Sequence, residues 1–148
     1  MGRLFHLAVL ASAVAVVCAA DDVSLEELKR RAAAAEGGRR ADLFIDVAQR
    51  QIEAADSRFT EGKTEEGQAA VDDAVAAAEE ASAAAVESRS HMKRTEIALR
   101  RASRRLSDIS RSLPFDERKR TEEAVIKLEK IRTDLLTAMF APKKKDKS

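Results

Sequence analysis

The chain has 148 residues, of which 36% are charged and 3% aromatic, and it carries a formal net charge of +1. This length fits one domain. Abundant Ala, Glu, Arg and Lys, with neither Trp nor Tyr, predict an all-α class held by packed helices. The balanced charge argues against nucleic-acid binding as the main task.

Residues 1–20 have the layout of a secretory signal peptide. A short basic lead precedes an almost wholly apolar run over 4–17, and small residues precede the first acids. We therefore expect export to the periplasm or the cell exterior, with cleavage after Ala20. The alternatives are a retained membrane anchor, because the run approaches the length of a span, and a lipoprotein acylated at Cys18. A Val before Cys18, where a lipobox has a small residue, makes the lipoprotein the weaker alternative.

A first short helix is expected from Ser24 to Ala35. Ser24 and Glu27 have the spacing of a capping box, and the Gly pair at 37–38 is expected to end the helix. A second helix is predicted over about Arg40 to Thr60, with apolar residues at alternating spacings of four and three. The short connection after it predicts an antiparallel neighbour.

A long central helix is expected from Thr64 to Leu113, where apolar or small residues keep a heptad spacing over about six repeats. Unbroken, it would be roughly 75 Å long. The alternative is a break near residues 88–91 and a compact four-helix bundle, but the seam keeps its phase through that point, which favours continuity. A long helix exposes more seam than its neighbours cover, so a homodimer is also an expectation.

The last helix is predicted over about Asp116 to Phe140, after a Pro that suits a helix start. We expect it to fold back on the second half of the central helix, so the helical domain covers residues 21–141. Residues 142–148 form a basic tail with nothing to bury, and we expect it to be disordered.

The segments DDVSLEELKRRAAAA, GRRADLFIDVAQRQIEAAD, TEGKTEEGQAAVDDAV and RTDLLTAMF resemble uncharacterised exported helical proteins of soil bacteria, notably acidobacteria. The likeness covers most of the chain after residue 20. It implies export and a helical fold, but no activity, because that group has no assigned function.

Residues 59–66, Phe-Thr-Glu-Gly-Lys-Thr-Glu-Glu, resemble the turn of a tetratricopeptide repeat. There a Gly precedes an acidic helix start, and Ala74 would be the small residue of the second helix. The Trp, the first-helix Gly and the closing Pro of that repeat are missing, and no second copy follows at a period of about 34 residues. A generic helical hairpin is the favoured interpretation.

No residue pattern predicts an enzyme, a metal site or a bound cofactor. His91 is the one candidate for acid-base or metal chemistry after residue 20, with Glu87 one turn before it. This spacing differs from the Glu-x-x-His pair of di-iron bundles, and no second set exists. We expect His91 to be a solvated helix residue that pairs with Glu87. No phosphate loop or nucleophile motif is present.

A band of arginines on the second half of the central helix is the candidate site for an anion or a partner: Arg100, Arg101, Arg104, Arg105 and Arg111. Guanidinium groups one turn apart could contact phosphates in pairs. The favoured alternative is structural, with the arginines paired to acids of the helix over 116–140. Stacking aromatics for single-stranded nucleic acid are absent from the sequence.

These observations predict an exported, non-enzymatic helical protein that acts by protein–protein contact. Two alternatives stay open. One is a periplasmic holdase-like chaperone that uses the apolar seam and the arginines to hold unfolded clients. The other is a binder of anionic membrane or envelope polymer through the band from Arg100 to Arg111. Membrane contact would then be peripheral, because no span remains after cleavage.

Overall fold

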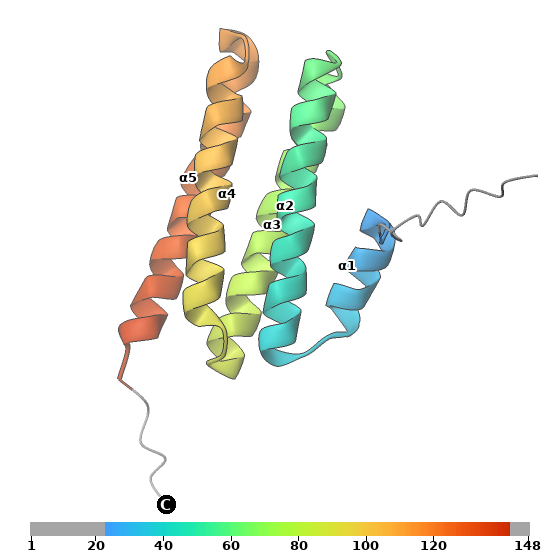
Figure 1. Cartoon of the computed structure of the whole chain (residues 1–148). Coiled ribbons are helices and arrows are strands. Elements are labelled where there is room, and N and C mark those ends of the chain that lie inside the picture. The colour runs from blue at the N-terminus through green and yellow to red at the C-terminus, as the bar shows by residue number, and fades with distance from the viewer. Residues whose placement is uncertain (1–22, 143–148) are drawn as a thin grey trace, which may run out of the picture.

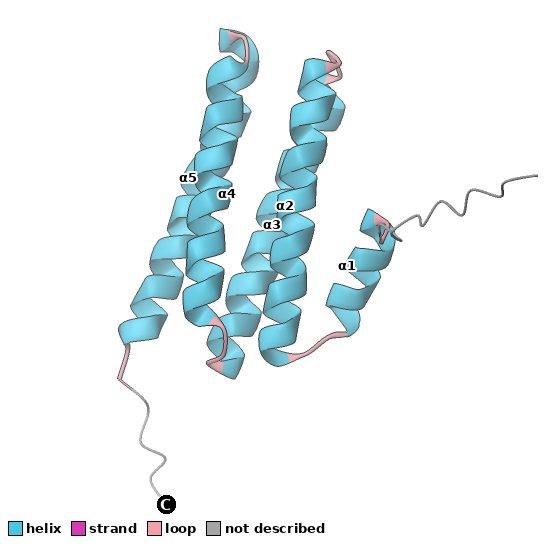
Figure 2. Cartoon of the chain, viewed as in Figure 1, coloured by secondary structure: helices cyan, strands magenta, loops and turns pink. Residues whose placement is uncertain are grey.

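The fold is all-α, as the composition predicted. A computed structural model describes residues 23–142, and within them every regular element is a helix, joined by short loops (Figure 2). The expected signal peptide and the tail from residue 143 onward lie outside the described residues. The helices are α1 (Leu25–Ala34), α2 (Gly37–Thr60), α3 (Thr64–Ser88), α4 (Met92–Ser112) and α5 (Phe115–Phe140).

The four long helices form two antiparallel hairpins, α2–α3 and α4–α5, that lie side by side (Figure 1). Helix α2 runs beside α4, and α3 runs beside α5, so the bundle has two layers of two helices. The short α1 packs outside this bundle, against α2 and α3. Consequently the outward faces of α3 and α4 lie at opposite corners of the bundle. None of the described helices is long and apolar enough to cross a membrane.

The expected continuous helix from Thr64 to Leu113 is wrong, and the alternative with a break near residues 88–91 is confirmed. Arg89 and His91 take left-handed backbone conformations, with φ of 49° and 59°, and the chain reverses between α3 and α4. The amide of Ser90 donates to the carbonyl of Ala85, which closes the end of α3. The seam keeps its phase because both helices face one core, so heptad phase does not distinguish one long helix from a hairpin.

The core follows the predicted seams. In α3 the buried residues are small, and Ala74, Ala78, Ala81 and Ala85 have no exposed surface. Larger side chains from the other helices fill the space beside them, namely Ile45 and Ile52 on α2, Leu99 and Leu106 on α4, and Leu128 and Leu135 on α5. Because alanine takes little room, α2 and α3 form the most closely packed helix pair.

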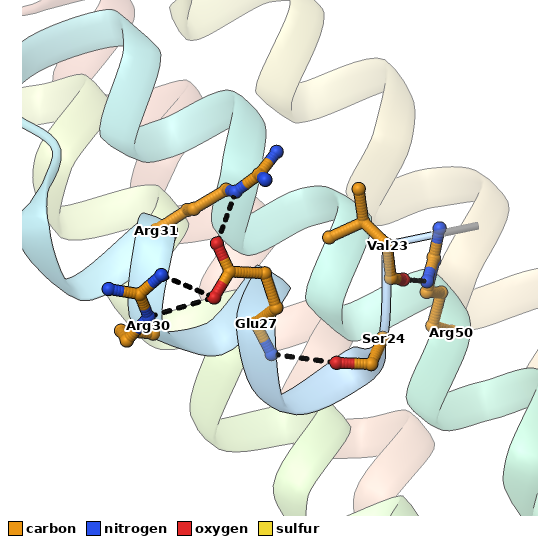
Figure 3. A network of polar contacts seen from close by, with 6 residues as sticks. All are labelled: Val23, Ser24, Glu27, Arg30, Arg31 and Arg50. Carbon is orange, nitrogen blue, oxygen red and sulfur yellow. Dashed lines mark hydrogen bonds and ion pairs between the residues drawn. The ribbon is translucent and has the colours of Figure 1, made fainter. Parts of the chain in front are cut away.

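The N-terminus of α1 has the predicted cap in part. The Ser24 hydroxyl accepts a hydrogen bond from the Glu27 amide at 3.2 Å (Figure 3). The Glu27 carboxylate does not reach back to the cap, however, and accepts hydrogen bonds from Arg31 and Arg30 instead. These two arginines, Arg31 first, lower the pKa of Glu27. An Arg50 guanidinium donates to the Val23 carbonyl and fixes the start of α1 on α2.

Helix α2 begins at Gly37, three residues before the predicted start at Arg40. Gly37 has a φ of 58° and opens the helix, while Gly38 lies against the α3–α4 turn. A Cβ on Gly38 would come within 2.7 Å of the Ser90 hydroxyl and 2.8 Å of the His91 ring. Helix α1 thus ends at Ala34, before the Gly pair, and the two glycines that were expected to break it are the first residues of α2. The missing Cβ of Gly38 leaves room for the α3–α4 turn.

Candidate binding surface on α4

The outward face of α4 is strongly basic. The core side of the helix is occupied by Leu99 and Leu106, which leaves the charged residues on the solvent side. We call this face the basic ridge. It carries one acid, Asp108, and seven bases: Lys93, Arg94, Arg100, Arg101, Arg104, Arg105 and Arg111.

Three of these bases have acid partners, and none of the three partners is on α5. Arg94 lies 3.4 Å from Asp42 on α2, and Arg105 lies 2.6 Å from Asp56 on α2. Arg111 pairs with Asp108 on α4 itself. The expected pairing of the arginine band with acids of the last helix is therefore wrong. Asp42 and Asp56 reach the ridge because α4 packs beside α2.

The ion pair that does join α4 to α5 has the opposite polarity to the expected one. Arg132 on α5 donates to Glu96 on α4 at 2.7 Å and to Glu129 at 3.1 Å. The hydrogen bonds to these carboxylates, Glu96 first, raise the pKa of Arg132. Glu96 is nearly buried, so this pair belongs to the packing between the two helices.

The other four bases of the ridge have no acid partner within residues 23–142. They are Lys93, Arg100, Arg101 and Arg104. Four cations without countercharges, spread over a helix face of about 16 Å, attract an anionic or acidic ligand.

The ridge borders two different grooves. Arg101 and Arg105 lie on the α2 side, and Arg101 lines both hollows found there. Arg104 and Arg111 lie on the other side, where they line a hollow between α4 and α5. The structure thus divides the predicted band between two sides of α4, because Arg101 and Arg104 point in directions about 60° apart around the helix.

The larger hollow on the α2 side has a volume of about 620 Å³, and we call it the α2–α4 groove. Its apolar lining comes from Ile45 on α2 and from Met92, Ile97 and Ala98 on α4. Its α4 wall is basic and its α2 wall acidic, with Asp42 and Asp46. Shielding of the Asp46 carboxyl from water raises its pKa, against the attraction of Arg94.

His91 lies at one end of this groove and not in a helix. Its Nδ1 is 3.0 Å from Oδ2 of Asp42, so the expected pairing with Glu87 is wrong. The α3–α4 turn brings His91 beside α2. No residue spacing in the sequence indicated this contact, because His91 and Asp42 are 49 residues apart. Among the described residues no group of three or more His, Cys, Asp or Glu side chains could hold a metal ion.

The acidic wall of the groove was missed by the sequence analysis. Asp42 and Asp46 are four residues apart, and this spacing places them on one side of a helix. Their position opposite Arg94 and Arg101 depends on α2 packing beside α4. A comparison with protein families, with curated proteins and with solved structures finds no match to the chain.

Proposed function

We propose that this is an exported, non-enzymatic protein that acts by protein–protein contact, and that its α2–α4 groove holds an acidic amphipathic helix of its partner. The observation that carries the proposal is the apolar lining of the groove beside Lys93 and Arg101, two bases without acid partners in the described part of the chain. Export is inferred from the composition of residues 1–20.

The mixed lining of the groove favours a protein segment over an anionic polymer or membrane. Asp42 and Asp46 on the α2 wall repel a ligand that is uniformly negative, whereas an amphipathic helix can turn its acids toward α4 alone. Apolar anchors of such a helix, spaced at three and four residues, suit Ile45 and Ile97 in the lining of the groove.

A holdase-like chaperone is supported less well. That interpretation relied on the heptad seam as an apolar surface for clients. The seam residues Ala78, Ala85, Leu99 and Leu106 are all buried in the core between the two hairpins, so clients cannot reach them while the bundle is folded.

The test compares three negatively charged probes. The first is a synthetic 20-residue helical peptide with Leu on one face and Glu on the other, the second is polyglutamate of equal charge, and the third is a vesicle containing phosphatidylglycerol. We expect the amphipathic peptide to bind at least about tenfold more tightly than polyglutamate, because only the peptide also buries apolar surface. Binding should weaken as salt is raised.

The other outcomes identify the alternatives. Equal binding of the peptide and of polyglutamate would show that charge alone is recognised and would contradict the groove. Preferential binding to the vesicles would favour a peripheral membrane protein. If none of the three probes binds at low salt, the basic ridge is structural and the proposal fails.

A further inference from the structure

The α2–α4 groove has a titratable imidazole at one end. His91, in the α3–α4 turn, lines the groove together with Asp42 and Asp46 of α2 and Lys93 and Arg94 of α4. The His91 side chain is 43% exposed, so it exchanges protons with the solvent. An imidazole changes its charge between about pH 7.5 and pH 5.5, where exposed carboxylates and guanidinium groups keep theirs.

The packing of the turn holds this imidazole in place. The carbonyl of His91 accepts hydrogen bonds from the amide and the hydroxyl of Thr95, at 2.9 and 3.0 Å. The ring lies against the first turn of α2, where a Cβ on Gly38 would come within 2.8 Å of it. Its Nδ1 is 3.0 Å from Oδ2 of Asp42. A charge on His91 therefore appears beside the acidic wall of the groove.

Protonation of His91 would change the charge of this wall without breaking the contact. With a neutral imidazole, Nδ1–H donates to Asp42 and the pair carries one negative charge. With an imidazolium, the same hydrogen bond remains and the pair is neutral. The other oxygen of Asp42 lies 3.4 Å from Arg94.

The charged groups around His91 come from three parts of the chain. Helix α2 supplies Asp42 and Asp46, α4 supplies Lys93 and Arg94, and the turn itself carries Arg89. The last acid of α3, Glu87, lines a different hollow beside Gly37 and Arg40. Within the groove, the only charges that repel an acidic ligand are thus the two aspartates of the α2 wall.

We propose that protonation of His91 regulates the α2–α4 groove, so that it binds an acidic helix more tightly at about pH 5.5 than at about pH 7.5. This inference rests on the proposed function, because it concerns the same site and the same class of ligand. Protonated His91 neutralises Asp42, and the acids of the ligand then meet less repulsion from α2. Asp46 acts in the same direction, because shielding from water raises its pKa and favours its neutral form.

The test measures the affinity of the acidic amphipathic peptide by calorimetry at pH 7.5 and pH 5.5, at constant salt. We expect the wild type to bind about three- to fivefold more tightly at the lower pH. His91→Asn should bind like the wild type at pH 7.5 and lose most of the gain at pH 5.5. Asparagine does not titrate and tolerates the left-handed backbone of residue 91, and circular dichroism verifies that the variant is folded.

Asp46→Asn is the control on the opposite wall. It should bind more tightly than the wild type at pH 7.5, because one repulsive charge is gone, and it should keep the gain that depends on His91. Glutamates of the peptide stay ionised at both pH values. Any effect of pH on the peptide itself would remain in His91→Asn.

An NMR titration provides a second readout. By linkage, a peptide that binds more tightly to the protonated form must favour protonation by the same factor. The midpoint of the His91 signal, which is identified by its loss in His91→Asn, should therefore rise by about 0.5 to 0.7 when the peptide is bound.

The outcomes separate this inference from the proposed function. Peptide binding of equal strength at both pH values, or a gain that His91→Asn keeps in full, would overturn the regulation and leave the proposed function standing. So would a His91 midpoint that the peptide does not move. If the peptide binds at neither pH, the proposed function fails and this inference fails with it.

Discussion

Gly38 shows how one residue fixes the distance between two elements. It is the second residue of α2, a position where most side chains are tolerated, yet its Cα faces the turn that joins α3 to α4. The space that a Cβ would need is occupied by Ser90 and His91. The sequence analysis treated the Gly pair only as a helix break, because nothing local indicates that a turn 50 residues later packs against it.

We predict that Gly38→Ala destabilises the protein. In an exposed helix this change stabilises by up to about 1 kcal/mol, but here the methyl group would lie 2.7 Å from the Ser90 hydroxyl. The expected loss is about 1–3 kcal/mol, typical of an overpacked contact. Urea unfolding measures it. A gain in stability would show that the turn does not approach α2, and Ser90→Gly should recover part of the loss.

At the scale of elements, the sequence predicted the helix class, most boundaries and the seams. The end of α2 at Thr60, the start of α3 at Thr64, the span of α5 and the buried faces of α3 and α4 agree with the expected ones. The α3–α4 turn was only the less favoured alternative, because it contains neither Gly nor Pro. Arg89 and His91 adopt φ values that glycine prefers, so the usual signal of a helix end is absent.

Replacing Arg89 by Gly is therefore predicted to stabilise the protein, by up to about 1 kcal/mol. A left-handed conformation costs an L-residue about that much, and glycine adopts it without the penalty. The control is Glu87→Gly, two residues earlier in the last turn of α3, which should destabilise by a similar amount. Thermal unfolding of both variants provides the comparison. If Arg89→Gly destabilises as Glu87→Gly does, residue 89 is helical and the turn is wrongly placed.

At the scale of the molecule, the turn decides between an elongated protein and a bundle. A continuous helix would separate residues 66 and 111 by about 67 Å. In the bundle these two residues lie at the same end, on α3 and α4, which are diagonal neighbours (Figure 1). The candidate site depends on this difference, because only the bundle brings the acids of α2 beside the bases of α4.

Spin labels at Glu66→Cys and Arg111→Cys, in a Cys18→Ser background, measure this distance. Helix axes in contact are 8–10 Å apart, so a diagonal pair with flexible labels should give a distance under about 30 Å. An excess of unlabelled chain suppresses distances between copies. A distribution centred near 65 Å would restore the continuous helix and exclude the α2–α4 groove.

The proposed function depends on which side of α4 the partner occupies, and Arg101 and Arg104 provide the comparison. Both are exposed, both lack an acid partner among residues 23–142, and each replacement by Gln removes one charge. Arg101 lines the α2–α4 groove, whereas Arg104 faces the α4–α5 side.

The most direct test is the affinity of the acidic amphipathic peptide for Arg101→Gln and Arg104→Gln, measured by calorimetry at constant salt. We predict that Arg101→Gln weakens binding about five- to tenfold, because it removes a charge in contact with the peptide. Arg104→Gln should weaken it less than about twofold, through the screened field alone. Equal losses in the two variants, or a larger loss in Arg104→Gln, would contradict binding in the α2–α4 groove.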